Sequence, residues 1–298
     1  MSLLDTPLCG LLGVRYPIVQ APMANNAPPG LAAAVSAAGA LGSIAGATVS
    51  PDELRTAIRE VRETTGAPFA VNLFAAPYLR DGVLEVVLEE RPPVFSFTLG
   101  LVDPEPLQRA GIVVLGTATS VEEAQALEQA GVDAVVAQGA EAGGHRGSFL
   151  DGFPLVPVAE LVASCADAVS LPVVASGGIM DGAGIAELLR RGAAGVSLGT
   201  AFLFTPEAAR PPEHLEALRS LDTVVTDAYT GRPMRAARTR VLEELMAGPA
   251  PLPFPEQRKV SAAKGPLFMG GTGAARGRDL PAAELVRVLV AETNAAEA

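Results

Sequence analysis

Cysteine, histidine and basic residues are all scarce in this chain of 298 residues. With only two cysteines, Cys9 and Cys165, no disulfide framework can form, and a reducing cytoplasm is the expected location. Two histidines and no HExxH motif exclude the usual transition-metal sites, so no metal is expected. Lysine and arginine number 22 against 33 acidic residues, for a net charge of −11. Without a basic surface to neutralise phosphates, nucleic acid is not an expected partner.

Charge is also absent from residues 16–51, which include a long run of small residues at 31–47. An uncharged stretch of this length can form a membrane helix. Glycines interrupt the run, however, and a buried strand, helix and strand fit the pattern better. We therefore expect no membrane segment. The composition, 49% apolar and 18% charged, excludes bulk disorder and is enough for a large core.

Short apolar runs alternate with helical patterns along the chain. The runs expected to be strands begin at Pro17, Leu41, Phe69, Val94, Ile112, Ala134, Pro172 and Gly195. Near-continuous apolar strands separated by helices indicate a parallel sheet that is buried on both faces. Eight strands that start 18–38 residues apart predict an α/β fold, the (β/α)8 TIM barrel, over residues 17–204. Residues 205–298, rich in proline and arginine, are expected to be a C-terminal helical elaboration of the eighth unit.

Capping residues mark several helix starts. Residues 50–53 (SPDE) and 120–123 (SVEE) each match a capping box, and Asp181 is expected to cap the helix after strand seven. The longest interval between strand starts contains an insertion, residues 141–154, directly after strand six. Loops that follow strands lie on the catalytic face of such a barrel. The insertion is therefore the first place where we expect a functional site.

The start of this insertion contains one histidine among glycines. In residues 137–147 (AQGAEAGGHRG), strand six ends at Gln138, and Gly143 and Gly144 precede His145. Glycines would let the imidazole project into a cavity, and its ordinary pKa of about 6.5 suits proton transfer. We therefore expect His145 to be functional. His214 lies in a helical run beside acidic residues and is expected to be a solvated helix residue.

Two strand ends with glycines predict a phosphate site. Ser176, Gly177 and Gly178 end strand seven, and Gly199 and Thr200 lie in strand eight. The loops after these two strands build the usual phosphate site of this fold. Glycine allows close approach of the backbone, whose N–H groups can hold an anion.

Three further features have competing interpretations. Ala21, Pro22 and Met23 leave strand one and either pack against a flat ring or simply end the strand. Asn72, near a strand end, is either a ligand contact or a hydrogen-bonded core amide. Residues 195–199 (GVSLG) match the nucleophile elbow of serine hydrolases, with Ser197 as the nucleophile. Because the apolar run continues through residue 204, Ser197 is expected inside a strand, which disfavours the hydrolase.

Together these motifs resemble those of the nitronate monooxygenase family, formerly called 2-nitropropane dioxygenases. The resemblance covers most of the chain, through residues 17–24 (PIVQAPMA), 71–74 (VNLF), 96–100 (SFTLG), 137–147, 171–179 (LPVVASGGI), 195–207 (GVSLGTAFLFTPE), 229–233 (YTGRP) and 278–286 (RDLPAAELV). It implies a single FMN-binding TIM-barrel domain over residues 1–298. It also implies an oxidoreductase that uses O2 to convert alkyl nitronates into a carbonyl compound and nitrite, with nitroalkanes left open as further substrates.

The resemblance implies a role for each candidate residue. His145 would be the catalytic base or a hydrogen-bond donor to the nitro group. The other candidates would bind FMN: Ala21, Pro22 and Met23 at the ring, with Asn72, Gln138, Gly143 and Gly144 close to the flavin, and Ser176, Gly177, Gly178, Gly199 and Thr200 around the phosphate.

Several alternatives stay open at this point. Flavin-dependent enoyl-thioester reductases that use NAD(P)H have a similar glycine–histidine loop. A non-catalytic flavin-binding protein and the serine hydrolase are the others. Residues 269–273 (MGGTG) depart from the family pattern where relatives line the substrate pocket, so substrate identity is less firmly implied than the cofactor. The excess of arginine over lysine and the abundant alanine indicate a bacterial gene, and the oligomeric state is open, a homodimer included.

Overall fold

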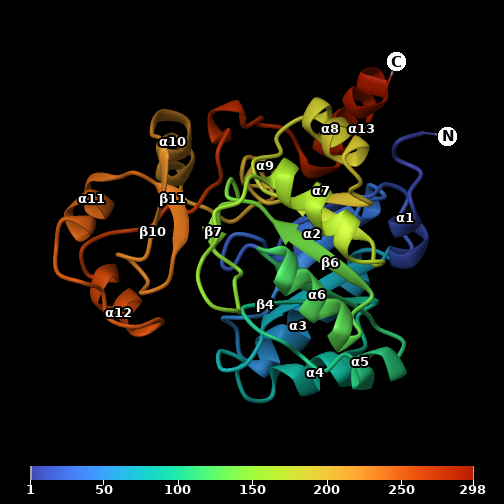
Figure 1. Cartoon of the computed structure of the whole chain (residues 1–298), viewed down its shortest axis with the longest axis horizontal. Coiled ribbons are helices and arrows are strands. Elements are labelled where there is room, and N and C mark those ends of the chain that lie inside the picture. Colours follow the sequence, from blue (N-terminus) through green and yellow to red (C-terminus); the bar gives the residue numbers. More distant parts are fainter. Residues whose placement is uncertain (1, 298) are drawn as a thin grey trace.

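The computed structural model describes residues 2–297, in which a barrel lies beside a smaller lobe (Figure 1). The barrel strands are β1 (Ile18–Gln20), β2 (Gly42–Ala45), β3 (Phe69–Phe74), β4 (Val94–Thr98), β5 (Val113–Ala118), β6 (Ala134–Gln138), β8 (Val173–Ser176) and β9 (Gly195–Leu198). They pair in parallel in the order β1-β9-β8-β6-β5-β4-β3-β2, and a bridge between Val19 and Leu41 joins β1 to β2. The predicted (β/α)8 TIM barrel is confirmed.

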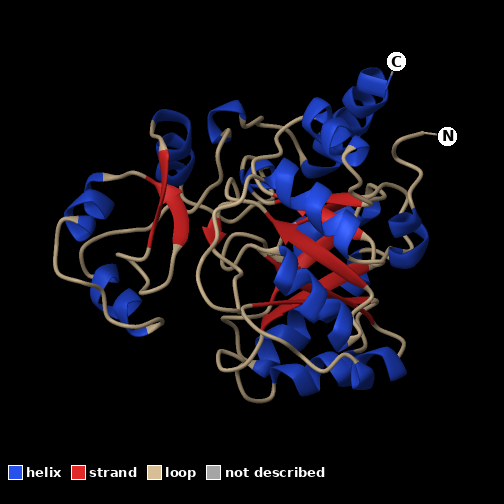
Figure 2. Cartoon of the chain, viewed as in Figure 1, coloured by secondary structure: helices blue, strands red, loops and turns tan. Residues whose placement is uncertain are grey.

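Helices surround the strands of the barrel (Figure 2). The helices that connect successive strands are α2 (Pro29–Ala37), α3 (Pro51–Thr64), α4 (Val83–Glu90), α5 (Glu105–Arg109), α6 (Val121–Ala130), α7 (Val158–Ala168) and α8 (Gly182–Arg190). The C-terminal helix α13 (Ala282–Glu297) packs against α8 and α2. No helix within residues 2–297 has both the length and the apolar composition needed to cross a bilayer.

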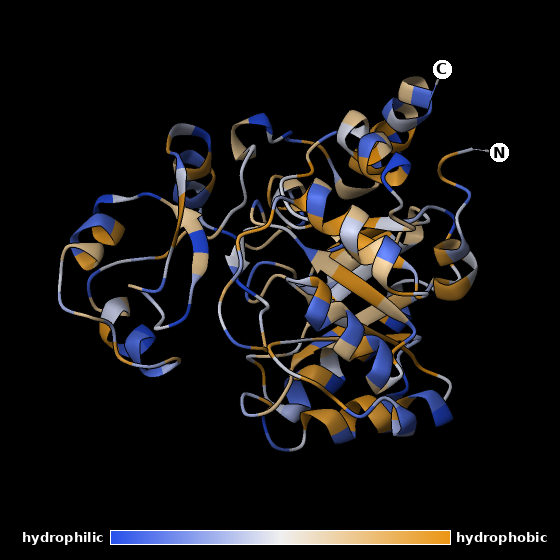
Figure 3. Cartoon of the chain, in the orientation of Figure 1, coloured by the Kyte–Doolittle hydropathy of each residue, from blue (hydrophilic) through white to orange (hydrophobic). Residues whose placement is uncertain are grey.

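Burial on both faces explains why the barrel strands are so apolar (Figure 3). One set of their side chains, which includes Ile44 and Phe95, packs in the same cluster as helix residues such as Leu54. The other set, which includes Leu115, fills the barrel interior. The short helix α1 (Pro7–Leu12) adds Leu8 to this interior cluster and closes the end of the barrel away from the insertion.

The predicted helix caps form, with one difference. Ser50 and Glu53 make the reciprocal capping box at the start of α3, and the Asp181 side chain caps α8. At α6 only half of the box forms. The Ser120 side chain accepts a hydrogen bond from the Glu123 backbone, but the Glu123 carboxylate turns away toward the insertion. That carboxylate has a different function, described below.

The last barrel strand is shorter than predicted. β9 ends at Leu198, and the rest of the apolar run forms the helix α9 (Thr200–Leu203). Phe202 and Leu203 are both buried. A short run that is apolar on every side gives no periodicity to separate a strand from a buried helical turn. The expectation that strand eight contains Gly199 and Thr200 was therefore wrong, although both residues still lie at its carboxyl end.

The smaller lobe contains α10 (Pro212–Ser220), β10 (Thr223–Thr226), β11 (Met234–Ala237), α11 (Arg240–Met246) and α12 (Glu256–Ala262). A short 3-10 helix (Ala274–Arg276) follows it. The helical pieces agree with the sequence pattern, but β10 and β11 were not predicted. They form an antiparallel sheet with β7 (Gly144–His145), in which Met234 lies opposite His145. The glycine–histidine loop of the barrel is thus also a strand of the lobe.

Candidate functional site

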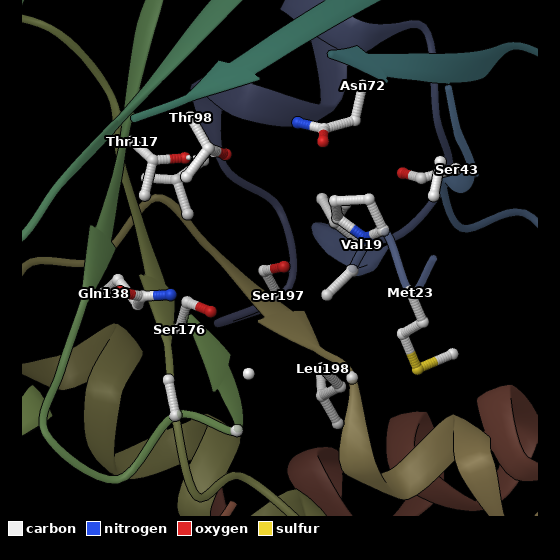
Figure 4. A pocket seen from close by; sticks show the side chains of 18 of the residues that line it. Val19, Met23, Ser43, Asn72, Thr98, Thr117, Gln138, Ser176, Ser197 and Leu198 are labelled. Atoms are coloured by element: carbon white, nitrogen blue, oxygen red, sulfur yellow. Dashed lines mark hydrogen bonds between the residues drawn. The ribbon is translucent and has the colours of Figure 1, made fainter. Parts of the chain in front are cut away.

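A cavity of about 240 Å³ lies at the carboxyl ends of the barrel strands. Each barrel strand contributes side chains to its wall, as Figure 4 shows for Val19, Ser43, Asn72, Thr98, Thr117, Gln138, Ser176 and Ser197. Every residue predicted for the site lines this cavity: Ala21, Pro22, Met23, Asn72, Gln138, Gly143, Gly144, His145, Ser176, Gly177, Gly178, Gly199 and Thr200. The structure therefore brings the whole predicted set together.

Unpaired backbone donors lie at the ends of β8 and β9. The N–H groups of Gly177, Gly178 and Thr200 donate no hydrogen bond within residues 2–297. Gly178 has a φ of +69°, and a Cβ there would lie 2.9 Å from the Cβ of Glu141, so the position favours glycine. The Thr200 hydroxyl is already engaged, since it accepts a hydrogen bond of 2.8 Å from the Gly271 backbone. Backbone donors that face a cavity in this way suit an anionic ligand.

Two amide side chains shape the cavity wall. The Gln138 amide bridges the loop, because its nitrogen donates to the His145 carbonyl at 3.0 Å and its oxygen accepts from the Gly147 backbone at 2.8 Å. The Asn72 amide donates to the Ser96 hydroxyl at 2.9 Å. Each NH2 group has a second hydrogen, so each amide can still donate to a ligand.

Three arginines hold the loop that carries His145. Arg146 is fully buried and donates to the Gly139 carbonyl at 2.6 Å, and Arg235 donates to the Ala140 carbonyl at 2.7 Å. Arg232 donates to the carbonyl of Arg146 at 3.3 Å. None of the three forms an ion pair within residues 2–297. The carboxylates of Glu123 and Glu141 offset part of their charge. The charges that act on the His145 ring itself are those of Arg232 and Arg258, so its immediate surroundings are positive in a chain that is negative overall.

Glu123 fixes the other end of this loop. One carboxylate oxygen accepts hydrogen bonds from the backbones of Phe149 at 2.5 Å and Leu150 at 3.0 Å. The second oxygen accepts from the Thr119 backbone at 2.6 Å. The sequence pattern marked Glu123 only as part of a local cap, so its contact across 26 residues was missed.

The imidazole of His145 is enclosed between the barrel and the lobe. Its Nε2 lies 3.2 Å from the Thr230 hydroxyl, and its ring packs against Phe254 with 5.1 Å between centroids. Burial, together with the positive charges of Arg232 and Arg258, lowers the pKa of His145 to about 3. The ring is therefore neutral at pH 7 and can accept a proton.

The neutral state of the half-buried His145 predicts a loss of stability in mild acid. Unfolded histidine has a pKa of about 6.5, so the unfolded chain binds the proton first as the pH falls. From this shift, the free energy of unfolding should drop by about 2 kcal/mol between pH 7 and pH 5. Urea unfolding of the wild type and of His145→Asn at both pH values measures this drop in the free energy of unfolding. The variant should lose about 2 kcal/mol less than the wild type, whereas an equal loss in both would contradict a neutral His145.

The prediction that His214 is a solvated helix residue was wrong. The side chain is buried, its Nε2 donates to the Met269 carbonyl at 2.8 Å, and its ring stacks on Phe268. Met269 and Gly270 line the cavity, so His214 holds the divergent segment in place. The acidic neighbours in the sequence are exposed, while this position on α10 points to the segment that returns to the barrel. The sequence could not show that His214 is buried while its acidic neighbours are exposed, because its contact with Met269 joins residues that are 55 positions apart.

Ser197 lacks the partner that a nucleophilic serine needs. It lies in β9, as expected, and lines the cavity. Within residues 2–297 it forms no hydrogen bond to a histidine. The Nε2 atoms of both histidines are engaged elsewhere, with the Thr230 hydroxyl and the Met269 carbonyl. The geometry therefore does not support a serine hydrolase.

A closed parallel barrel with its cavity at the carboxyl ends of the strands defines a (β/α)8 barrel, the fold in which enzymes carry their active sites at that face. Comparison with known sequences then gives the family. The nitronate monooxygenase family model matches residues 5–81 and 76–292. The nitronate monooxygenase of Pseudomonas aeruginosa is 41% identical over 95% of this chain and 97% of its own. A protein of Staphylococcus saprophyticus, named probable nitronate monooxygenase, is 38% identical over 81% of both chains. The chain belongs to the nitronate monooxygenase family and is an oxidoreductase.

Solved structures agree over nearly the whole chain. Nitroalkane oxidase from Streptomyces ansochromogenes superposes with a TM-score of 0.90 at 38% identity, covering 97% of this chain and 98% of that one. FabK from Thermotoga maritima superposes with a TM-score of 0.85 at 32% identity, covering 98% and 96%. The coverage includes the lobe as well as the barrel.

Proposed function

We propose that this chain is a cytoplasmic, FMN-dependent enzyme that oxidises alkyl nitronates with O2 to a carbonyl compound and nitrite. The observation that carries this proposal is the meeting of His145 with the unpaired N–H groups of Gly177, Gly178 and Thr200 in one cavity. Membership of the nitronate monooxygenase family supports it. The positive surroundings of the His145 loop favour an anionic substrate such as a nitronate.

Several groups around the cavity support FMN as the cofactor. At the ends of β8 and β9, the N–H groups of Gly177, Gly178, Gly199 and Thr200 would hold the phosphate, next to Ser176. Ala21, Pro22 and Met23 would lie against the ring, and the amides of Asn72 and Gln138 and the backbone of Gly143 and Gly144 would lie close to it. Bound FMN would supply the electron acceptor for the oxidation.

His145 would act on substrates that arrive as neutral nitroalkanes. It would accept the proton from the α-carbon, and the electron pair of the C–H bond would remain on the nitronate that forms. Because burial holds its pKa low, His145 is protonated only when that negative charge develops beside it. A substrate that is already a nitronate needs no such transfer.

The proposal also treats the chain as one functional domain. The lobe supplies β11, which pairs with β7, and so it shares the loop that carries His145 with the barrel. A barrel without the lobe would lose this pairing and the contact between His145 and Thr230.

Steady-state assays of the FMN-loaded protein test the function. With propionate 3-nitronate, we expect nitrite release and O2 consumption without added nicotinamide cofactor. Oxidation of NADPH coupled to an enoyl thioester, without nitrite release from the nitronate, would instead identify a flavin-dependent reductase. A yellow protein that turns over neither substrate would be a non-catalytic flavin-binding protein.

A further inference from the structure

We propose that Thr230 is a positioning residue that fixes the tautomer of His145, so that Nε2 carries the ring proton and Nδ1 is the nitrogen that accepts a proton in the cavity. The role of Nδ1 in catalysis rests on the proposed function. The tautomer does not, and it can be measured separately.

The hydrogen bonds of the Thr230 hydroxyl determine the tautomer. Its Oγ1 lies 2.8 Å from the carbonyl oxygen of Arg232. A carbonyl can only accept, so the single hydroxyl proton is donated there. The same Oγ1 lies 3.2 Å from His145 Nε2 and 3.4 Å from the Arg232 backbone nitrogen. With its proton already used, the hydroxyl can only accept from Nε2, which must therefore carry the ring hydrogen.

The opposite tautomer would leave a buried acceptor without a partner. If the hydroxyl turned to donate to a bare Nε2, the Arg232 carbonyl would lose its donor. That carbonyl accepts no other hydrogen bond within residues 2–297, and Arg232 is buried. An unsatisfied buried carbonyl is costly, so the observed arrangement is favoured.

The turn that contains Thr230 has little freedom to move. Gly231 has a φ of +82°, and a Cβ there would lie 2.2 Å from the Leu252 carbonyl oxygen and 2.6 Å from the Phe254 nitrogen. On the other side of the turn, the Pro233 carbonyl accepts a hydrogen bond of 2.8 Å from the Arg146 backbone. Thr230 is fully buried between these contacts, so its hydroxyl is held at a fixed place beside His145.

This arrangement decides between the two roles considered for His145, which are catalytic base and hydrogen-bond donor to the nitro group. Nδ1 makes no hydrogen bond within residues 2–297, while the residue lines the cavity. Burial and the nearby charges of Arg232 and Arg258 keep the ring neutral, because together they lower the pKa to about 3. A neutral ring whose only N–H faces Thr230 has a lone pair for the substrate and no hydrogen to donate. His145 therefore takes the α-carbon proton at Nδ1 and does not donate a hydrogen bond to the nitro group.

Nitrogen NMR measures the tautomer directly. The chain has only two histidines, so a long-range proton–nitrogen spectrum of 15N-histidine-labelled protein shows two rings, and His214→Gln assigns them. In the wild type and in Thr230→Ser we expect a protonated Nε2 on His145. In Thr230→Val, which keeps the shape but removes the hydroxyl, we expect a shift toward protonated Nδ1. A wild-type ring protonated at Nδ1, or an unchanged ring in Thr230→Val, would overturn the proposal.

A matched control and an activity readout complete the test. Thr293→Val removes another buried threonine hydroxyl, which donates to the Leu289 carbonyl and does not line the cavity, and should leave the His145 ring unchanged. Thr230→Val should lower kcat for neutral nitroethane about tenfold with little change in KM, and Thr230→Ser should restore it. An unchanged kcat would overturn the catalytic part of the proposal. Failure of the wild type to oxidise any nitronate would contradict the proposed function and leave the tautomer result standing.

Discussion

Replacing His145 with alanine is expected to lower kcat/KM for neutral nitroethane by about 10²–10⁴-fold, the range that a positioned general base contributes. The variant has no group at this place to take the α-carbon proton. For ethyl nitronate, which has already lost that proton, the decrease should be no more than about tenfold. Nitrite release from both substrates at one pH measures the two values, and the ratio between them isolates the proton transfer.

The other histidine provides the control for this experiment. His214→Ala removes a buried histidine that contacts the cavity segment through Met269 but leaves the base in place. It should change the rates on nitroethane and ethyl nitronate by similar factors. If His145→Ala kept FMN and still oxidised nitroethane at the wild-type rate, His145 would not be the base.

Gly178→Ala is expected to weaken FMN binding at least about tenfold, which corresponds to ~1.4 kcal/mol. The residue has a φ of +69°, and an added Cβ would lie 2.9 Å from the Glu141 side chain and 3.0 Å from the Thr272 hydroxyl. Relief of these contacts would move the Gly178 N–H away from the phosphate. Fluorescence titration of the apoprotein with FMN measures the affinity.

Two comparisons separate a phosphate effect from general strain. Gly111 also has a positive φ, +81°, but an added Cβ there meets no atom within 4 Å, and the residue does not line the cavity. Gly111→Ala should therefore strain the backbone without changing FMN affinity. Riboflavin, which lacks the phosphate, should bind wild type and Gly178→Ala equally weakly. Equal binding of riboflavin and FMN by the wild type would contradict the assigned phosphate site.

The barrel could be predicted because its information is local. Strands buried on both faces are continuous apolar runs, such as residues 69–74 and 94–98, and the helix starts at Ser50 and Asp181 follow from short-range capping. That the candidate residues meet in one cavity could be predicted for a related reason. They lie near the ends of strands or in the loops that follow them, and the carboxyl ends of parallel strands in a barrel meet at one face.

The contacts that position the site could not be predicted, because they join distant parts of the chain. Thr230 meets His145 across 85 residues, and Glu123 reaches the loop across 26. A carboxylate or hydroxyl in the sequence does not show which distant backbone group it will bond. The strands β10 and β11 were missed for the same reason, since their third partner, β7, is a two-residue piece of a glycine-rich loop.

Anaerobic addition of propionate 3-nitronate to the FMN-loaded protein tests the central claim most directly. The account predicts that the protein purifies yellow or takes up FMN, that the nitronate alone bleaches the flavin absorbance, and that NADPH alone leaves it unchanged. Bleaching by NADPH but not by the nitronate would contradict the proposed reaction. A protein that neither contains nor takes up FMN would contradict the assignment of the cavity itself.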